Sequence, residues 1–360
     1  MRAGLAALAL ATAACGSETA PPDAGAAVWR LDSVGAITDP AFVRIRSVIS
    51  DSDGNVYVAD QSTASIRVYG PDGVLRRTIG RKGAGPAEFA DIYDIGWFGD
   101  TLVAIDPGNA RMTLLSRDGA PVSTRPVQPL TGGDLWLSQS GPRDLYARGY
   151  RIVDQSIVHT FIHHTPAGPA DTLVFPPDPD RATAGIDCMM GETISIFSTP
   201  FGSRAVYAVS PAGRLAVGRT GAYRIHLIGP AGDTVQTFSR PVEPIPIPDS
   251  AWTAGTADYS RFKAKYPGAR CQPARFERPA AQPPIRMFRW DDAGRLWVEA
   301  TTPGGYRFDV FAPDGALLGS SPAPPRDEDI PWHVRGGRLY TVLTDEDGAQ
   351  TVRVHAVRTP

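Results

Sequence analysis

Short apolar segments recur along this chain in pairs, and successive pairs are about 40 residues apart. Within each pair, apolar and polar residues alternate, and five of the six second segments run into a glycine turn. The first pair, at 56–60 and 66–69, leads into Pro71, Asp72 and Gly73. Alternation with a period of two is typical of half-buried strands, and Pro-Asp-Gly supplies the φ values of a tight turn. The pattern predicts hairpins throughout and no helix in these segments.

A repeat of this length that is built only of strands predicts a β-propeller, in which each repeat forms one radial sheet, or blade. Six blades of about 45 residues would use nearly the whole chain, which leaves little room for a second domain. The six repeats lie at 53–75, 99–119, 144–168, 213–232, 294–315 and 337–357.

The sixth repeat ends the chain without a turn or an outer strand, so the last blade would have an open edge of unpaired amides. Residues 28–34 alternate like a strand and precede the expected innermost strand of the first blade, at about 42–49. We expect residues 28–34 to pair with the last blade. The predicted fold is therefore all-β: a six-bladed β-propeller at 28–360 whose N-terminal strand closes the last blade.

The N-terminus has the pattern of an export signal. Arg2 precedes an apolar run at 3–14, which is too short for a permanent membrane span but typical of a signal peptide. Small residues lead into Cys15, as in bacterial lipoprotein signals, where the cysteine is lipidated; ordinary secretion is the alternative. We expect an export signal at 1–15, a flexible tether at 16–27, and an exported protein that is lipid-anchored to a membrane and faces the periplasm or the cell exterior.

The 36 basic and 38 acidic residues nearly cancel. This balance gives no overall field suited to nucleic acid or to an anionic membrane face. We therefore expect a chain that binds no nucleic acid and meets a membrane only through its lipid anchor. We also expect a monomer.

Two segments interrupt the repeat, at about 176–201 and 241–284, and each contains one cysteine, Cys188 and Cys271. Both precede an innermost strand, and connections of this kind emerge on one face of a propeller, so the insertions should be neighbours. In an oxidising compartment we expect the two cysteines to pair; two separate thiols are the alternative. Residues 250–266 predict one short helix that caps a mouth of the channel.

Three stretches carry a resemblance to a known family: 53–60, 66–73 and 80–89. The last contains the run from Gly83 to Phe89, GAGPAEF, which fits an interblade Gly-x-Gly-Pro-x-Glu-Phe signature. The chain resembles the NHL-repeat six-bladed propellers, and more narrowly the exported bacterial six-bladed β-propeller lipoproteins. The resemblance implies the fold over about 28–358 and implies almost nothing about activity.

Charged and polar residues on the expected innermost strands could reach a central channel, although only one of each close pair can face it. A mixed ring of arginine and carboxylate could bind a small anionic or zwitterionic ligand through charge-assisted hydrogen bonds; an ion-paired interior is the alternative. The candidates are Arg44, Arg46, Asp91, Asp94, Tyr207, Arg286, Arg289 and His333.

No catalytic or metal-binding pattern is recognisable, and we expect no cofactor. His159 and His163 share one strand face and would offer a metal only two ligands. The predicted function is an exported module that binds a small-molecule ligand or a protein partner; the alternative is a channel-centred lyase or lactonase that uses a divalent metal. Three converging His, Asp, Glu or Asn side chains would favour the enzyme. Arginines paired with carboxylates, beside apolar insertion loops, would favour the binding module.

Overall fold

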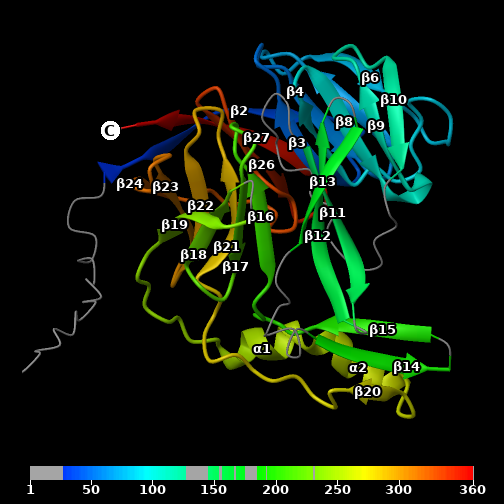
Figure 1. Cartoon of the computed structure of the whole chain (residues 1–360), viewed down its shortest axis with the longest axis vertical. Helices are drawn as coiled ribbons and strands as arrows, with labels where there is room; N and C mark the ends of the chain where they lie inside the picture. The colour runs from blue at the N-terminus through cyan, green and yellow to red at the C-terminus, as the bar shows by residue number, and fades with distance from the viewer. Residues whose placement is uncertain are drawn as a thin grey trace, which may run out of the picture.

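The computed structural model describes residues 27–126, 145–153, 156–165, 168–174, 185–191, 193–229 and 232–359. Figure 1 shows that this part of the chain is almost entirely β-structure. Its strands form seven separate sheets, joined by turns and two short helices. No helix in the described ranges is long and apolar enough to cross a membrane.

Four repeats of the sequence form antiparallel meanders of four strands each. The turns fit the prediction, since Gly54 and Gly73, which flank the first hairpins, have φ values of 79° and 75° that glycine adopts most easily. The strands of these meanders are β3 Ile45–Ser50, β4 Val56–Asp60, β5 Ser65–Tyr69 and β6 Leu75–Ile79; β7 Asp94–Phe98, β8 Thr101–Asp106, β9 Arg111–Leu115 and β10 Pro121–Pro126; β16 Ala205–Val209, β17 Leu215–Arg219, β18 Arg224–Ile228 and β19 Thr234–Ser239; and β21 Ile285–Trp290, β22 Leu296–Thr302, β23 Gly305–Phe311 and β24 Leu317–Pro322.

The C-terminal repeat forms β25 His333–Arg335, β26 Arg338–Thr344 and β27 Gln350–Arg358. An N-terminal strand, β2 Arg30–Thr38, pairs antiparallel with β27 and completes a sheet of four strands. The partner of the predicted N-terminal strand is thus as expected, but its boundaries are not.

The N-terminal segment divides at Trp29. The two residues before it, β1 Ala27–Val28, pair in parallel with β24 of the neighbouring sheet, so the flexible tether cannot extend to residue 27 as expected. Trp29 is buried, and its ring meets that of Trp297 edge-on at 5.5 Å. The segment therefore joins two sheets, because burial of this indole holds it at the boundary between them.

The remaining repeat forms a sheet of three described strands, β11 Leu145–Val153, β12 Ser156–Thr165 and β13 Gly168–Val174. The two insertions together build a further small sheet in the order β15-β14-β20, from β14 Gly185–Met190, β15 Thr193–Ser198 and β20 Arg270–Gln272. The helices α1 Asp249–Gly255 and α2 Ala257–Lys265 belong to the second insertion.

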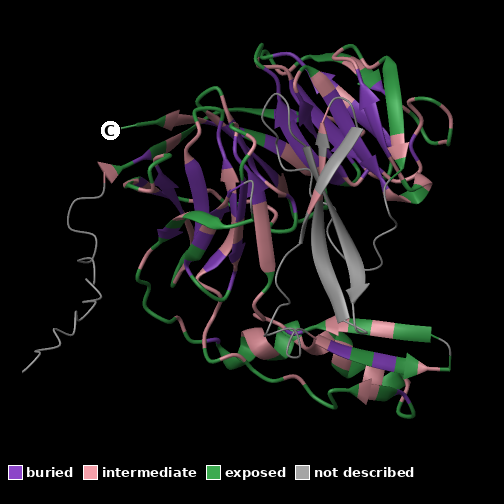
Figure 2. Ribbon diagram, viewed as in Figure 1, coloured by how far each residue is buried: buried purple, intermediate pink, exposed green. Residues whose placement is uncertain are grey.

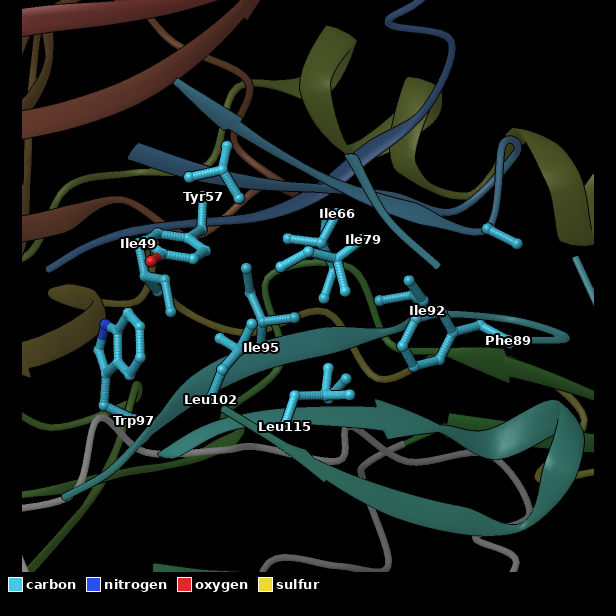
Figure 3. Packing of buried hydrophobic residues seen from close by; sticks show 14 residues of the cluster. Ile49, Tyr57, Ile66, Ile79, Phe89, Ile92, Ile95, Trp97, Leu102 and Leu115 are labelled. Atoms are coloured by element: carbon cyan, nitrogen blue, oxygen red, sulfur yellow. The ribbon is translucent and has the colours of Figure 1, made fainter. Parts of the chain in front are cut away.

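Neighbouring sheets contact each other through their first strands. β7 contacts β3, β3 contacts β25, β25 contacts β21, and β21 contacts β16. The hydrophobic cores lie between neighbouring sheets, and Figure 3 shows one of them between the β3–β6 and β7–β10 meanders, where Tyr57, Phe89 and Trp97 pack with aliphatic side chains. In Figure 2 the buried residues gather in these sheets, whereas the small sheet and the helices are mostly exposed or intermediate. The chain thus has a propeller-like all-β fold.

Candidate functional site

Three of the eight candidate channel residues come together near the first strands of three different sheets. Asp94 begins β7, Arg289 lies on β21 and His333 begins β25. Desolvation lowers the pKa of Arg289, and the neighbouring Asp94 carboxylate opposes that shift. We call Asp94, Arg289 and His333, together with Ser50 of β3, the central cluster. Four separate repeats are needed to build it.

His333 is a buried, neutral imidazole. Burial lowers its pKa well below the usual histidine value, and the cationic Arg289 and Arg335 lower it further. Its Nε2 lies 3.0 Å from the Ser50 hydroxyl, whereas its Nδ1 has no hydrogen-bond partner among the described residues. If the buried hydroxyl donates to Nε2, the proton of the ring sits on Nδ1. The ring then presents an unused N–H donor close to a guanidinium.

The contact between Ser50 and His333 does not amount to a nucleophilic dyad. Both side chains are buried. Within the described residues no carboxylate orients Nδ1, as a catalytic triad would require. An N–H donor beside a guanidinium instead suits an anionic acceptor.

Arg286, a fourth candidate, is paired with carboxylates. It contacts Glu328, and its Nε lies 4.0 Å from a carboxylate oxygen of the buried Glu299. Burial lowers the pKa of Arg286, but the charge of Glu328 acts in the opposite direction, and the pKa is raised overall. Glu299 is itself held by Arg326, with distances of 2.5 Å from Nη2 to each carboxylate oxygen. This part of the interior is an ion-paired network.

Two candidates lie outside the first strands, so their prediction as inner-strand residues is wrong. Arg44 is exposed just before β3, and its backbone N–H donates to the Asp60 carboxylate at 3.0 Å. Asp91 precedes β7, its backbone N–H donates to Asp106 at 2.9 Å, and its side chain accepts from Gln61. In both repeats a carboxylate at the end of the second strand binds these amides and delays the start of the first strand.

The last two candidates lie on first strands but outside the central cluster. The Arg46 guanidinium stacks on the Tyr93 ring, 4.4 Å from its centroid. Tyr207 of β16 is half-buried against a small apolar group that contains Val209 and Leu215.

Three residues of this interior escaped the sequence analysis: Ser50, Glu299 and Arg326. Glu299 carried a usable signal, since it is a charged residue inside the apolar strand β22. Ser50 and Arg326 carried none, because a serine in a strand and an arginine in a loop are common everywhere.

The described residues contain no group of three His, Cys, Asp or Glu side chains that could hold a metal ion. His159 and His163 lie on β12, in register with Tyr150 and Tyr146 of β11. Arginine and carboxylate pairs are present in the described interior, as between Arg286 and Glu328 and between Arg326 and Glu299.

The two insertions are neighbours, as predicted, and a disulfide joins Cys188 of β14 to Cys271 of β20. The single helix expected at 250–266 is instead two helices that are separated at Thr256. The backbone of Thr256 has φ −93° and ψ 1°, which ends α1, and its N–H bonds to Trp252. That this module caps a mouth of the channel stays a prediction. Cys15 and its lipidation lie outside the described residues.

One face of the small sheet is covered by α2. Cys188 and Ser195 are directly paired and share this face with Phe197. The Phe197 ring lies 5.4 Å from Tyr259 and 5.0 Å from Phe262, both on α2. The opposite face carries exposed aliphatic side chains from β14 and β15.

No protein-family model and no curated protein matches this chain. Among solved structures, a Bacteroides fragilis protein described as exported is similar with a TM-score of 0.53 and 12% identity, covering 92% of this chain and 95% of that chain. A Bacteroides vulgatus member of the DUF4221 family is similar with a TM-score of 0.51 and 10% identity, covering 92% and 99%. Virginiamycin B lyase from Staphylococcus aureus has a TM-score of 0.47 and 10% identity, covering 91% and 99%. The first two likenesses concern the fold alone.

Proposed function

We propose that this chain is an exported, lipid-anchored, six-bladed β-propeller that binds a small anionic ligand, such as a carboxylate or phosphate, at its central cluster. The ring is supported by the succession of five first strands and by the pairing of β2 with β27. The β11–β13 sheet, which falls between the second and fourth repeats in the chain, would supply the remaining blade.

The observation that carries this proposal is a buried imidazole nitrogen without a partner beside a cation in the interior; this nitrogen is a donor in the tautomer in which Ser50 donates to Nε2. His333 Nδ1 has no hydrogen-bond partner within the described part of the chain and lies near enough to Arg289 for the guanidinium to lower the pKa of the ring. A buried donor without an acceptor costs about 1–3 kcal/mol, and a bound anion would remove that cost. Asp94 balances the guanidinium and would limit binding to ligands of low charge.

Export is supported by the leader pattern at 1–14 and by the Cys188–Cys271 disulfide, which suits an oxidising compartment. The exported description of the Bacteroides fragilis structural relative agrees with this. The lipid anchor depends on Cys15 alone.

Thermal unfolding of the protein in phosphate or acetate, compared with sodium chloride at equal ionic strength, tests the ligand site. We expect the midpoint to rise with anion concentration, since a ligand at a hundred times its Kd stabilises by about 2.7 kcal/mol. Arg289→Gln and His333→Gln should abolish the rise, whereas Arg76→Gln, at an exposed pair with Asp72, should keep it. Equal midpoints in all three salts for the unaltered protein would refute the site.

Metal analysis of the purified protein distinguishes the proposed binding module from the alternative, a metal-dependent lyase or lactonase. A stoichiometric divalent metal, together with loss of the metal on chelation, would favour a lyase or lactonase and overturn the proposed function.

A further inference from the structure

The surroundings of His333 leave one of its two ring nitrogens without a partner. Strand β25 packs against β3, β21 and β26. From these strands, the Ser50 hydroxyl lies 3.0 Å from Nε2, the Arg289 guanidinium acts on the ring through its charge, and the Tyr340 ring lies 5.7 Å from the imidazole. Nδ1 is buried and has no hydrogen-bond partner within the described ranges. A ligand in the central cluster therefore has this nitrogen to engage.

Protonation of the ring would give each nitrogen a suitable partner. In an imidazolium both ring nitrogens are donors, and a serine hydroxyl can accept as well as donate. Nε2–H would donate to Ser50, and Nδ1–H would donate to a bound anion. In the neutral ring one nitrogen carries no proton, and a hydrogen bond from a charged donor is the stronger one. The charged ring is thus the better partner for an anion, whichever tautomer the free protein holds.

The fixed charges near the ring already balance one another. Arg289 has the Asp94 carboxylate beside it, and Arg326, whose charge also reaches Arg289, binds both carboxylate oxygens of Glu299. Arg335, two residues further along β25, is partly exposed, so water screens its charge. An anion added to this interior would leave one uncompensated negative charge, which is costly in a buried site. A proton taken up with the anion removes that charge.

We propose that the central cluster binds the anion of a carboxylic acid together with one proton, which His333 holds, so that the pair is equivalent to the undissociated acid. This inference rests on the proposed function, because it requires the anion site. The proton comes from the solvent and adds to the ring nitrogen that lacks one, and no bond of the ligand breaks. Burial and the nearby cations lower the pKa of the free ring, whereas a bound anion would raise it. By linkage, the ligand then binds more tightly as pH falls.

Calorimetric titration of the purified protein with sodium formate tests the proton uptake. Carboxyl groups have pKa values near 4, so formate stays ionised between pH 5.5 and 7.5, and a change of affinity in this range belongs to the protein. We expect the affinity to rise by up to about tenfold per pH unit as pH falls, which is the slope for one proton. In a pH-stat, saturation with formate should consume up to about one equivalent of acid per chain.

Asp94→Asn should produce a gain of affinity, which misfolding does not mimic. Without this carboxylate the interior has a spare positive charge, and formate needs no proton to balance it. The affinity at pH 7.5 should rise about tenfold, and its dependence on pH should flatten.

Ser50→Ala tests the second hydrogen bond of the charged ring. The substitution removes the acceptor of Nε2–H, so the affinity should fall more at pH 5.5 than at pH 7.5. The matched control is His226→Gln, at a histidine of β18 in another sheet whose pKa is also lowered. This variant should keep the parental affinity and the parental pH dependence.

The outcomes separate this inference from the ligand site on which it rests. Equal affinity for formate at pH 5.5 and 7.5, with no acid consumed, would overturn the proton uptake and leave the anion site in place. Absence of binding at both pH values would overturn the anion site and the proton uptake together. Loss of the pH dependence in His226→Gln would assign the proton to that histidine and overturn the role of His333.

Discussion

At the scale of single residues, carboxylates bind the backbone amides that precede the first strands and form ion pairs between neighbouring sheets. Asp60 and Asp106 each bind two amides that precede the first strand of their repeat. The buried Asp309 accepts from Tyr223 at 2.6 Å and pairs with Arg240 at 2.8 Å, and so connects two neighbouring sheets. These acidic residues are occupied with backbone or ion-pair contacts, which argues against a catalytic role for them.

His333 should make the stability of the protein depend on pH. The pKa of His333 in the folded state is well below 6.5, so at mildly acidic pH this residue is protonated in the unfolded chain and neutral in the folded chain. The free energy of unfolding should therefore fall as pH drops below about 6.5, by up to about 1.4 kcal/mol per pH unit. His333→Gln should flatten this slope in urea unfolding between pH 5 and 8.

The matched control is His226→Gln. His226 lies on the third strand β18 and its pKa is lowered less strongly, by burial and by Arg224, so its removal should change the slope less. Identical slopes for the parent and the His333→Gln variant would contradict the assignment of His333 as a buried neutral group.

At the scale of elements, the insertion module has little core of its own. Ile186 and Cys188 are its buried strand residues, and its aromatic rings are half-buried at best. Phe197, Tyr259 and Phe276 form a chain of edge contacts between β15, α2 and the segment after β20. A module with so few buried contacts depends on its covalent link.

Replacing Cys188 and Cys271 by serine should unfold this module and leave the larger sheets intact. Amide hydrogen exchange should rise about a hundredfold or more in β14, β15, β20 and α2, as expected for local unfolding, with no change in β4, β5 or β22. Reduction of the unaltered protein should reproduce the pattern. Retained protection in β14 after reduction would show that the aromatic contacts suffice without the disulfide.

At the scale of the whole molecule, the ends of the chain hold neighbouring sheets together. β2 pairs with β27 along its length, while Ala27 and Val28 pair with β24. Trp29 lies between these pairings in an apolar cluster that includes Trp297 and Trp332. The same segment therefore contributes to two sheets and to the core between them.

Removal of residues 27–38 should prevent stable folding, because β27 would lose one of its two partner strands and the buried Trp29 and Ile37 would be lost. Loss of the Trp29 side chain alone should cost about 3–5 kcal/mol. Removal of residues 1–26 is the control and should leave the urea midpoint unchanged. A chain lacking 27–38 that unfolds cooperatively at the parental midpoint would show that the N-terminal strand is dispensable.

Much of the site could not be predicted, for reasons that particular residues make clear. Asp94, Arg289 and His333 were candidates because they belong to first strands, but Arg44 and Asp91 looked equally suitable. Arg44 and Asp91 differ from the other candidates because their backbone amides bind the carboxylates of Asp60 and Asp106. The first strand of each repeat therefore begins after these residues. Such long-range hydrogen bonds leave no periodic trace in the sequence. Glu88, in contrast, has partners close to it in the chain, since its carboxylate accepts from the Gly85 N–H and from the Arg81 guanidinium.

The sequence by itself determined the strands of the repeats, their turns, the pairing of the two chain ends and the meeting of the two cysteine-containing insertions. The strands and turns follow from local alternation and from glycine and proline conformations, and the two meetings follow from the order of the repeats along the chain. Only the tertiary structure decided which polar residues share the interior, and that the strand divides at Trp29. It alone also placed Met189, Ile194 and Ile196 on an uncovered face. Each of these depends on contacts between residues far apart in the chain, where burial and charge pairing act without a sequence pattern.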